Sequence, residues 1–206
     1  MRVMQQCWFL KDLRSFEGNR MNAKVKEEKL TNIEWLGQHL RAKTPNYEQF
    51  GSGGTNDEVP AWEIRCSAFA AIETDLAKAL AALYVWGYKD KSSYKYVLNH
   101  LATIVVKEAK GRGQKPNVIS LENLAELMAR LVLDFELEPT LNEVFTSKGR
   151  LYYAGICAHQ LTYDAYRKTW KEYESLMELA LVSAKWEIEN YIEKYRKNLI
   201  RCSLPK

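Results

Sequence analysis

From Thr162 to about Leu199 the sequence predicts one amphipathic helix, because the segment contains neither proline nor glycine. Apolar side chains recur at intervals of three and four residues, and glutamates occupy the other side. At about 1.5 Å per residue such a helix would be about 57 Å long, which exceeds the diameter of a small domain. Its distal half must therefore protrude, pair with another chain, or break.

Two arrangements would bury the apolar stripe of this helix. In the first, the stripe packs along the core of its own chain. In the second, part of it forms a two-helix seam with a second subunit, which would make the protein a homodimer through its C-terminal helix.

The rest of the chain also has helical periodicity, and no segment is typical of a strand-rich unit. Residues 61–86 are rich in alanine, the strongest helix former, and predict one central helix that Gly87 ends. The expected fold class is therefore all-α, a helical bundle with a helix-turn-helix-like unit and a long C-terminal helix. Further helices are predicted over 22–42, over 94–109 with Ser92 or Ser93 as the N-cap, over 121–135 after the N-cap Ser120, from Thr140 as the N-cap to Phe145, and over 151–155 after a break at Gly149.

The longest stretch of loop composition lies at 51–60, where three glycines precede Pro60. This Gly-rich loop divides the chain into an N-terminal arm and helix at 1–50 and a main helical domain at 61–206. The main domain contains the helix-turn-helix-like unit at about 147–171.

Cysteine usage and hydropathy indicate a cytoplasmic protein. The four cysteines, at positions 7, 66, 157 and 202, form no CxxC pair and no disulfide framework, which favours reduced thiols. No apolar run reaches the roughly 18 residues of a membrane span. The N-terminus lacks the pattern of a signal peptide, so we expect no export and no membrane insertion.

No set of catalytic residues is visible in the sequence. Cys157 and His159 are the only nucleophile and base close together, but residues two positions apart on a helix point to different faces. The glycines within 51–54 lack the Gly-Lys-Ser/Thr ending of a phosphate-binding loop, and the His and Cys residues do not have metal-ligand spacing. We expect neither an enzyme nor a bound metal or cofactor.

Charge is distributed unevenly along the chain, although the net charge is only +4. Residues 78–115 carry eight basic and two acidic side chains, residues 120–140 carry one basic and five acidic, and residues 147–171 carry five basic and one acidic. Two basic segments are thus separated by an acidic helix. In the first, Arg112 and Lys115 lie in a predicted loop whose backbone is able to approach phosphates.

The second basic segment has the order of a helix-turn-helix: a short helix, Gly155-Ile156, a few residues, and Thr162 as the N-cap of the long helix. In that arrangement the capped helix presents its first turns to the major groove of DNA. The turn between the two helices is longer than the usual three or four residues of a helix-turn-helix. The alternative interpretation of this segment is a helical hairpin whose basic edges are solvated. The side chains expected to pack against the preceding helices are Leu161, Ala165, Tyr166 and Trp170. The expected nucleic-acid contacts are Lys148, Arg150, Tyr163, Arg167, Lys168 and Lys171, with Arg112 and Lys115 from the first basic segment.

The segment from Gly149 to Trp170 resembles the C-terminal DNA-reading part of the phage late-gene antiterminators of the Q type. The similarity rests on a basic short helix followed by Gly-Ile, Leu-Thr and Ala-Tyr-Arg-Lys-Thr-Trp. Trp35-Leu36-Gly37 and the run from Leu83 to Tyr88 fit the same family. The resemblance implies a protein that binds a promoter-proximal DNA site and loads onto paused RNA polymerase. This chain differs in its longer turn, its lack of a zinc-binding cysteine set and its very long terminal helix.

The function predicted from the sequence is a nucleic-acid-binding regulatory protein of phage or bacterial type. Double-stranded DNA is the expected partner, transcription antitermination is the expected role, and RNA polymerase or another protein is the second expected partner. The alternative is an all-α protein-interaction module, an inhibitor or adaptor that binds no nucleic acid. It would use the acidic helix at 120–138 or the terminal helix as its interface.

Overall fold

The computed structural model describes residues 31–40 and 61–203, and every regular element in these two ranges is a helix. The all-α prediction is therefore confirmed. Three predicted segments lie outside the described residues: the arm before residue 31, the Gly-rich loop at 51–60, and the two ends of the helix predicted over 22–42. The described part of that predicted helix is α1 (Asn32–Leu40). No helix in the described ranges combines the length and apolar content needed to cross a bilayer.

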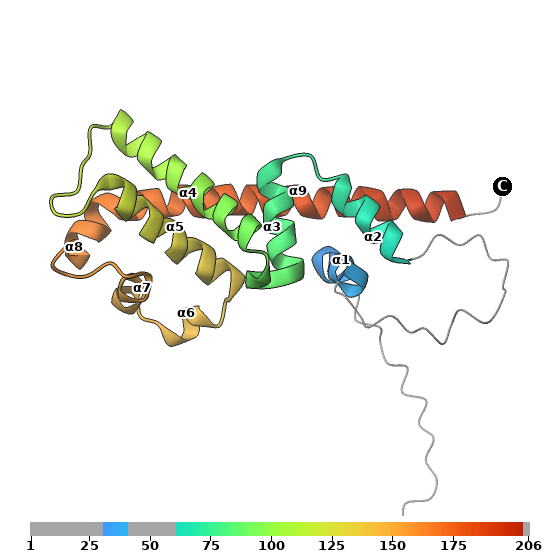
Figure 1. The fold of residues 1–206 in the computed structure, drawn as a ribbon, viewed down its shortest axis with the longest axis horizontal. Coiled ribbons are helices and arrows are strands. Elements are labelled where there is room, and N and C mark those ends of the chain that lie inside the picture. The colour runs from blue at the N-terminus through green and yellow to red at the C-terminus, as the bar shows by residue number, and fades with distance from the viewer. Residues whose placement is uncertain (1–30, 41–60, 204–206) are drawn as a thin grey trace, which may run out of the picture.

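The long C-terminal helix runs along the length of the molecule (Figure 1). It starts after the N-cap Thr162 with α8 (Tyr163–Ala165), passes through a π-helical turn at Tyr166–Trp170, and continues as α9 (Lys171–Ser203). The prediction of a long C-terminal helix is confirmed, and the helix contains a π turn that the sequence did not indicate. A π turn holds one more residue than an α turn, so it rotates the side chains that follow it relative to those before it.

Most of the other helices pack along this axis. α3 (Asp75–Trp86), α4 (Lys91–Gly111) and α5 (Leu121–Leu137) contact α9, as do α1 and α2 (Ala61–Ala70) nearer the C-terminal end (Figure 1). Asn32 of α1 is held there because it donates to Glu189 at 2.7 Å and accepts from Arg196 at 2.6 Å. The distal half of the long helix therefore neither breaks nor stands alone, since helices of the same chain cover one side of it.

The predicted central helix over 61–86 is wrong in one respect, because it is two helices that meet at an angle (Figure 1). The break lies at 71–74, where Thr74 acts as the N-cap of α3 and accepts from the Ala77 backbone N–H at 3.3 Å. The Thr74 N–H and hydroxyl also donate to Glu187 of α9, at 3.0 and 2.8 Å. These bonds end the helix early and direct α2 onto the distal part of α9. Gly87 ends α3 as predicted, with a φ of 62°.

The predicted caps of α4 are also wrong. The N-cap is Asp90, whose carboxylate accepts from the Ser93 backbone N–H at 3.2 Å, so the helix begins three residues before the predicted start. Ser92 and Ser93 instead donate their hydroxyls to that carboxylate, at 2.6 and 2.7 Å. An aspartate at this position satisfies the free N–H groups and also offsets the positive end of the helix dipole.

Between α5 and the long helix the chain forms α6 (Leu141–Val144) and α7 (Ser147–Ala154). Ser120 caps α5 as predicted and accepts from the Asn123 N–H at 3.2 Å, whereas the Thr140 side chain makes no cap bond to α6. The predicted break at Gly149 is wrong, because the N-cap of α7 is Thr146, which accepts from the Gly149 N–H at 3.2 Å. α7 ends at Gly155, whose φ of 92° is a left-handed conformation that favours glycine.

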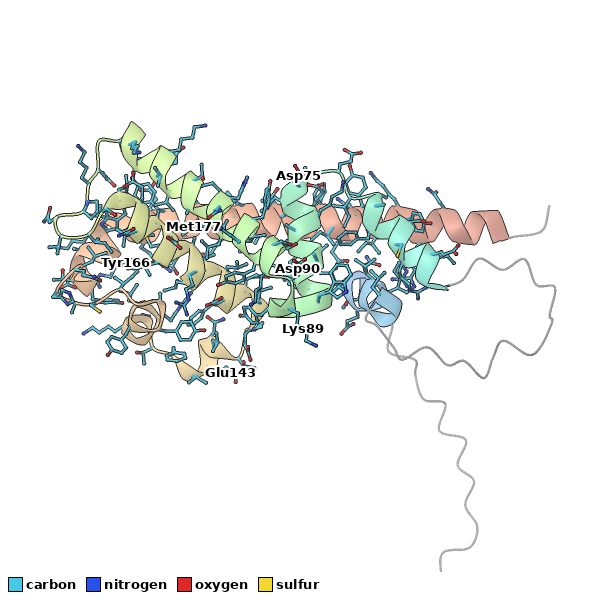
Figure 2. All side chains as sticks on the ribbon, viewed as in Figure 1. Asp75, Lys89, Asp90, Glu143, Tyr166 and Met177 are labelled. Atoms are coloured by element: carbon cyan, nitrogen blue, oxygen red, sulfur yellow. The ribbon has the colours of Figure 1, made fainter. Side chains whose placement is uncertain are left out.

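One continuous hydrophobic core joins these helices, and its side chains fill the space between them in Figure 2. α4 and α5 lie against each other over their length, and Met177 of α9 is fully buried in the same cluster. Burial of each such side chain contributes on the order of 1.5–3 kcal/mol. Fully buried members of the core include Leu80, Leu83, Leu101, Leu124, Met128, Leu133, Tyr173, Met177 and Ile188.

Candidate nucleic-acid interface

The helix-turn-helix-like unit is built from α7 and the start of the long helix, at one end of the molecule (Figure 1). α7 packs on α5, and the connection after it is hydrogen-bonded. Ile156 N donates to Leu151 O at 2.9 Å, and Leu161 N donates to Cys157 O at 3.0 Å. Because Ile156 and Leu161 are also buried, the long turn is a structured part of the fold.

The side chains predicted to pack inward lie on the inner face of this unit. Tyr166 and Trp170 are 4% and 3% exposed, and Leu161 is buried with them. Ala165 is partly buried against the same core. The π turn contributes to this arrangement, because both of its ends, Tyr166 and Trp170, face the core while the residues between them do not.

A cavity of about 230 Å³ lies between α7, the start of the long helix and α5. It brings together four of the side chains expected to contact nucleic acid, from positions that are up to 21 residues apart in sequence (150 and 171). Its lining is formed by Leu131, Ser147, Arg150, Leu151, Tyr163, Tyr166, Arg167, Lys171 and Glu174.

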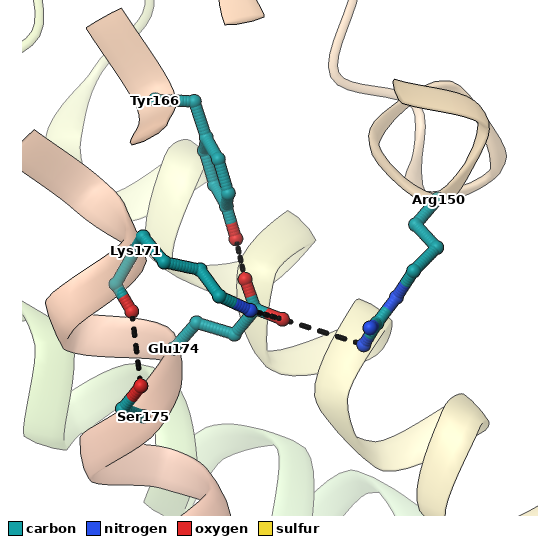
Figure 3. Close-up of polar contacts among 5 residues, drawn as sticks. All are labelled: Arg150, Tyr166, Lys171, Glu174 and Ser175. Atoms are coloured by element: carbon teal, nitrogen blue, oxygen red, sulfur yellow. Dashed lines mark hydrogen bonds and ion pairs between the residues drawn. The ribbon is translucent and has the colours of Figure 1, made fainter. Parts of the chain in front are cut away.

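Glu174 organises the inner part of this cavity (Figure 3). It is 2% exposed and accepts from Lys171 Nζ at 2.7 Å and from Arg150 Nη2 at 3.3 Å. Its second oxygen accepts from the Tyr166 hydroxyl. Burial, then the charge of Glu174, then this hydrogen bond raise the pKa of Tyr166 above its ordinary value, so that its hydroxyl stays protonated and donates.

Arg150 is held in place by more than its ion pair. Its guanidinium lies 4.5 Å from the centroid of the Phe135 ring, an arrangement that adds a cation–π contact. Its Nε is buried and has no hydrogen-bond partner among the described residues. Arg150 is therefore fixed in position with one donor left unused.

The remaining cations of the unit point to solvent. Arg167 and Lys168 are exposed, and neither makes an ion pair within the described part of the chain. Lys148 on α7 is exposed too, with its Nζ 5.5 Å from the centroid of the Tyr163 ring at the cavity. All six side chains predicted in this unit thus lie on the α7 side or on the first turns of the long helix, and we call these six the basic end.

The two side chains predicted from the first basic segment are placed differently, since neither lines this cavity. Arg112 donates to Glu172 at 2.8 Å and lies 5.5 Å from the Tyr173 ring centroid, so it ties its loop to α9. The hydrogen bond and charge of Glu172 raise the pKa of Arg112. Lys115 is exposed and lines a separate hollow of about 380 Å³ between the ends of α4 and α5.

Glu174 is the residue at this site that the sequence reasoning missed. Its spacing from Lys171 is a common helical ion-pair spacing, and on an exposed helix it would signal only a weak surface contact. Its burial depends on α5 and α7 packing over it, and no local pattern reveals that.

Cys157 and His159, the nucleophile and base that lie closest together in the sequence, have different surroundings in the structure. Cys157 is partly buried with its Sγ 3.8 Å from the Gly155 carbonyl oxygen, and His159 is exposed. In the described ranges, no group of three or more His, Cys, Asp or Glu side chains is placed to hold a metal ion. The basic end is therefore the site with the clearest chemical character in this part of the molecule.

Comparison of the chain with protein-family models, with curated proteins and with solved structures gives no match. The resemblance to the Q-type antiterminators stays a prediction from the residues. A functional assignment therefore depends on the geometry and charge of the basic end.

Proposed function

We propose that the protein is a regulatory protein that binds double-stranded DNA through the basic end. The observation that carries this proposal is the position of Arg167 and Lys168. Both are exposed on the first turns of a helix that Thr162 caps at one extremity of the molecule. A capped helix that presents cations at a free end has the form of the element that enters the major groove.

The charges of the basic end suit a polyanion. Glu174 neutralises only part of the positive charge of Arg150 and Lys171, and Lys148, Arg167 and Lys168 add three more positive charges nearby. Cations that replace the counterions of the DNA backbone give affinity, and free N–H groups at a helix N-terminus favour a phosphate. We assign phosphate contacts to Lys148 and Lys168 and groove contacts to Arg167 and Tyr163.

The expected biological setting is transcription regulation of phage or bacterial type, with antitermination as the specific role and RNA polymerase as a second partner. This setting rests on the residue pattern of Gly149–Trp170 described above, and the DNA contact itself does not depend on it. The two parts of the proposal are tested separately, because a DNA-binding measurement needs no polymerase.

The test measures binding of the full chain to fluorescently labelled duplex DNA by anisotropy as a function of salt. We expect the affinity to fall steeply with salt concentration, as counterion release requires. The double charge reversal Arg167→Glu with Lys168→Glu should weaken binding at least about tenfold.

The matched control is Lys194→Glu with Lys197→Glu, which changes the net charge equally on the far end of the same helix. Both control positions are exposed, and Lys197 makes only a surface pair with Glu193. The control should keep most of the affinity. Failure of duplex DNA to bind at low salt, or equal losses in the two double variants, would refute the proposal.

A further inference from the structure

The outward side of α9 carries three large apolar side chains that nothing in the described chain covers. Leu179, Val182 and Trp186 are 64%, 60% and 69% exposed. Their spacing of three and four residues places them in one stripe along the helix. Exposed apolar side chains are common singly, but a stripe of three on one helix is typical of an interaction surface.

The stripe lies opposite the side that α9 turns to the core. The buried side chains Met177, Leu181 and Ile188 are offset from the stripe by about half a turn of the helix. In the view of Figure 1, α2, α3 and α4 cross in front of α9, in agreement with their contacts to it. A helix of another molecule can therefore reach the stripe without displacing any described helix.

We propose that the stripe is a homodimer seam, in which α9 of a second copy of this chain lies antiparallel against it. In this register Leu179 lies opposite the partner's Val182. The two-fold axis crosses the helices midway between positions 179 and 182, so that Val182 also lies opposite the partner's Leu179. In the same register Trp186 lies opposite the partner's Ser175, so a large side chain meets a small one. Such large-to-small pairing is what close helix packing requires.

Charge complementarity supports the antiparallel direction. In this register Glu178 lies beside the partner's Lys185 at the edge of the stripe, and the two-fold axis makes the pair occur twice. Both side chains are exposed. Lys185 already donates to Glu136 at 2.9 Å, but an ammonium has three donors and can serve both carboxylates. In a parallel dimer Glu178 would instead face the partner's Ser183, with no ion pair.

None of the residues of the seam belongs to the basic end, but this register places the partner's Lys194 level with Arg167. The DNA titrations are therefore made below about 1 µM protein, where a dimer of micromolar Kd is mostly dissociated. The two basic ends would lie at opposite ends of the dimer. Loss of dimerisation and loss of DNA binding are therefore distinguishable, each by its own variants.

The test is the mass of the full chain in reducing buffer, measured by sedimentation equilibrium from about 1 to 100 µM. This range brackets the micromolar Kd expected for a small interface. We expect the mass to rise with concentration from the chain mass of 23.9 kDa toward twice that value. Val182→Asp should raise the Kd at least tenfold, because it places two carboxylates beside the two-fold axis.

The matched control is Val144→Asp on α6, since Val144 is 73% exposed and lies outside the seam. It should leave the Kd unchanged. Glu178→Lys and Lys185→Glu should each weaken the dimer, and the two together should recover affinity if the helices are antiparallel. Circular dichroism confirms that each variant is folded.

Three results would overturn the proposal. The first is a wild-type chain that stays at 23.9 kDa throughout, which includes the case of a stripe covered by a segment of its own chain. The second is a dimer that Val182→Asp and Val144→Asp weaken equally. The third, a double charge variant weaker than both single ones, would overturn the antiparallel register.

Discussion

A buried carboxylate is costly unless its charge is paired and its lone pairs are hydrogen-bonded. Glu174 meets this condition through a lysine one turn before it, an arginine on α7 and a tyrosine in the π turn. The three partners come from two elements, so the carboxylate joins α7 to the long helix. Its role is to hold the basic end together, although its own charge opposes a phosphate.

Glu174→Gln separates these two effects. The amide keeps the size of the side chain and can still accept from Tyr166, but it leaves Arg150 and Lys171 without a counter-charge. We expect the free energy of unfolding to fall by about 2 kcal/mol, less than for a fully buried pair because both cations are partly exposed. DNA affinity at low salt should not fall, since the basic end gains one positive charge.

Chemical denaturation measures the first effect, and anisotropy with duplex DNA measures the second. Glu126→Gln on α5 is the control, because Glu126 is exposed and its replacement should change the free energy of unfolding by less than about 0.5 kcal/mol. Equal stabilities of Glu174→Gln and wild type would show that the buried network contributes nothing.

At the scale of the element, the ends of the helices follow from single capping side chains. Asp90 starts α4, and the hydroxyls of Ser92 and Ser93, then the Ser93 N–H, lower the pKa of its carboxyl. A carboxyl whose folded pKa is lowered stabilises the fold above its unfolded pKa of about 3.9. That contribution is lost as the pH falls through the lower, folded value.

Asp90→Ala is therefore expected to cost about 1 kcal/mol at pH 7, the usual value of an N-cap. The difference from wild type should shrink as the pH falls below about 4, because the unfolded carboxyl is protonated first and the folded carboxyl follows at its lower pKa. Urea denaturation at both pH values checks this. The control is Asp75→Ala, which changes an exposed aspartate in the first turn of α3 that is not the N-cap of that helix. It should lower the free energy of unfolding at pH 7 by less than Asp90→Ala does. A difference between Asp90→Ala and wild type that does not change with pH would contradict the capping role.

Ser120, Gly87 and Gly155 were placed correctly from the sequence, because each cap acts within a few residues. Asp90 and Thr146 act over the same range but were missed, since the sequence offers more than one capping residue or break near each of these helix starts. The division of 61–86 was not predictable in the same way. Thr74 is held by Glu187, which lies 113 positions later in the sequence, so the bonds that end α2 exist only after α9 has packed against α3. Alanine favours a continuous helix there, and the tertiary contact outweighs that preference.

At the scale of the whole molecule, α9 is shared by two groups of helices. Its first part packs with α3, α4 and α5, and its distal part packs with α1 and α2 (Figure 1). The contact of α1 depends on few residues, among them the fully buried Leu36 and the Asn32 hydrogen bonds. The distal part of α9 should therefore open more readily than the rest.

Leu36→Ala tests this division. A Leu→Ala change in a core costs about 2 to 5 kcal/mol, and here the loss should be local. Hydrogen exchange should show faster exchange over 185–198 of α9 and little change over 163–181. Val118→Ala, at an exposed position, is the control and should change neither region. Uniform loss of protection along α9 would show one cooperative unit instead of two.

The basic end illustrates how far a sequence can locate a candidate site. Its six members within 147–171 were predictable from charge and from the order of helix, turn and capped helix. Neither the cavity nor Glu174 was predictable, because both depend on α5 and α7 packing beside the long helix. The ion pair between Arg112 and Glu172 joins positions 60 residues apart, so a basic loop residue was indistinguishable in sequence from a free one.

Helical periodicity and the lack of proline and glycine over 162–199 were enough to establish an all-α chain with a long terminal helix, because those preferences act between neighbouring residues. What lies on each side of that helix was decided only by tertiary packing. One side of α9 is covered by five helices of the same chain, while Leu179, Val182 and Trp186 on the other side remain exposed. From the sequence alone, the terminal helix could pack along its own core or against a second subunit. Both remained open because a helix can carry one apolar side for its own core and a second for a partner.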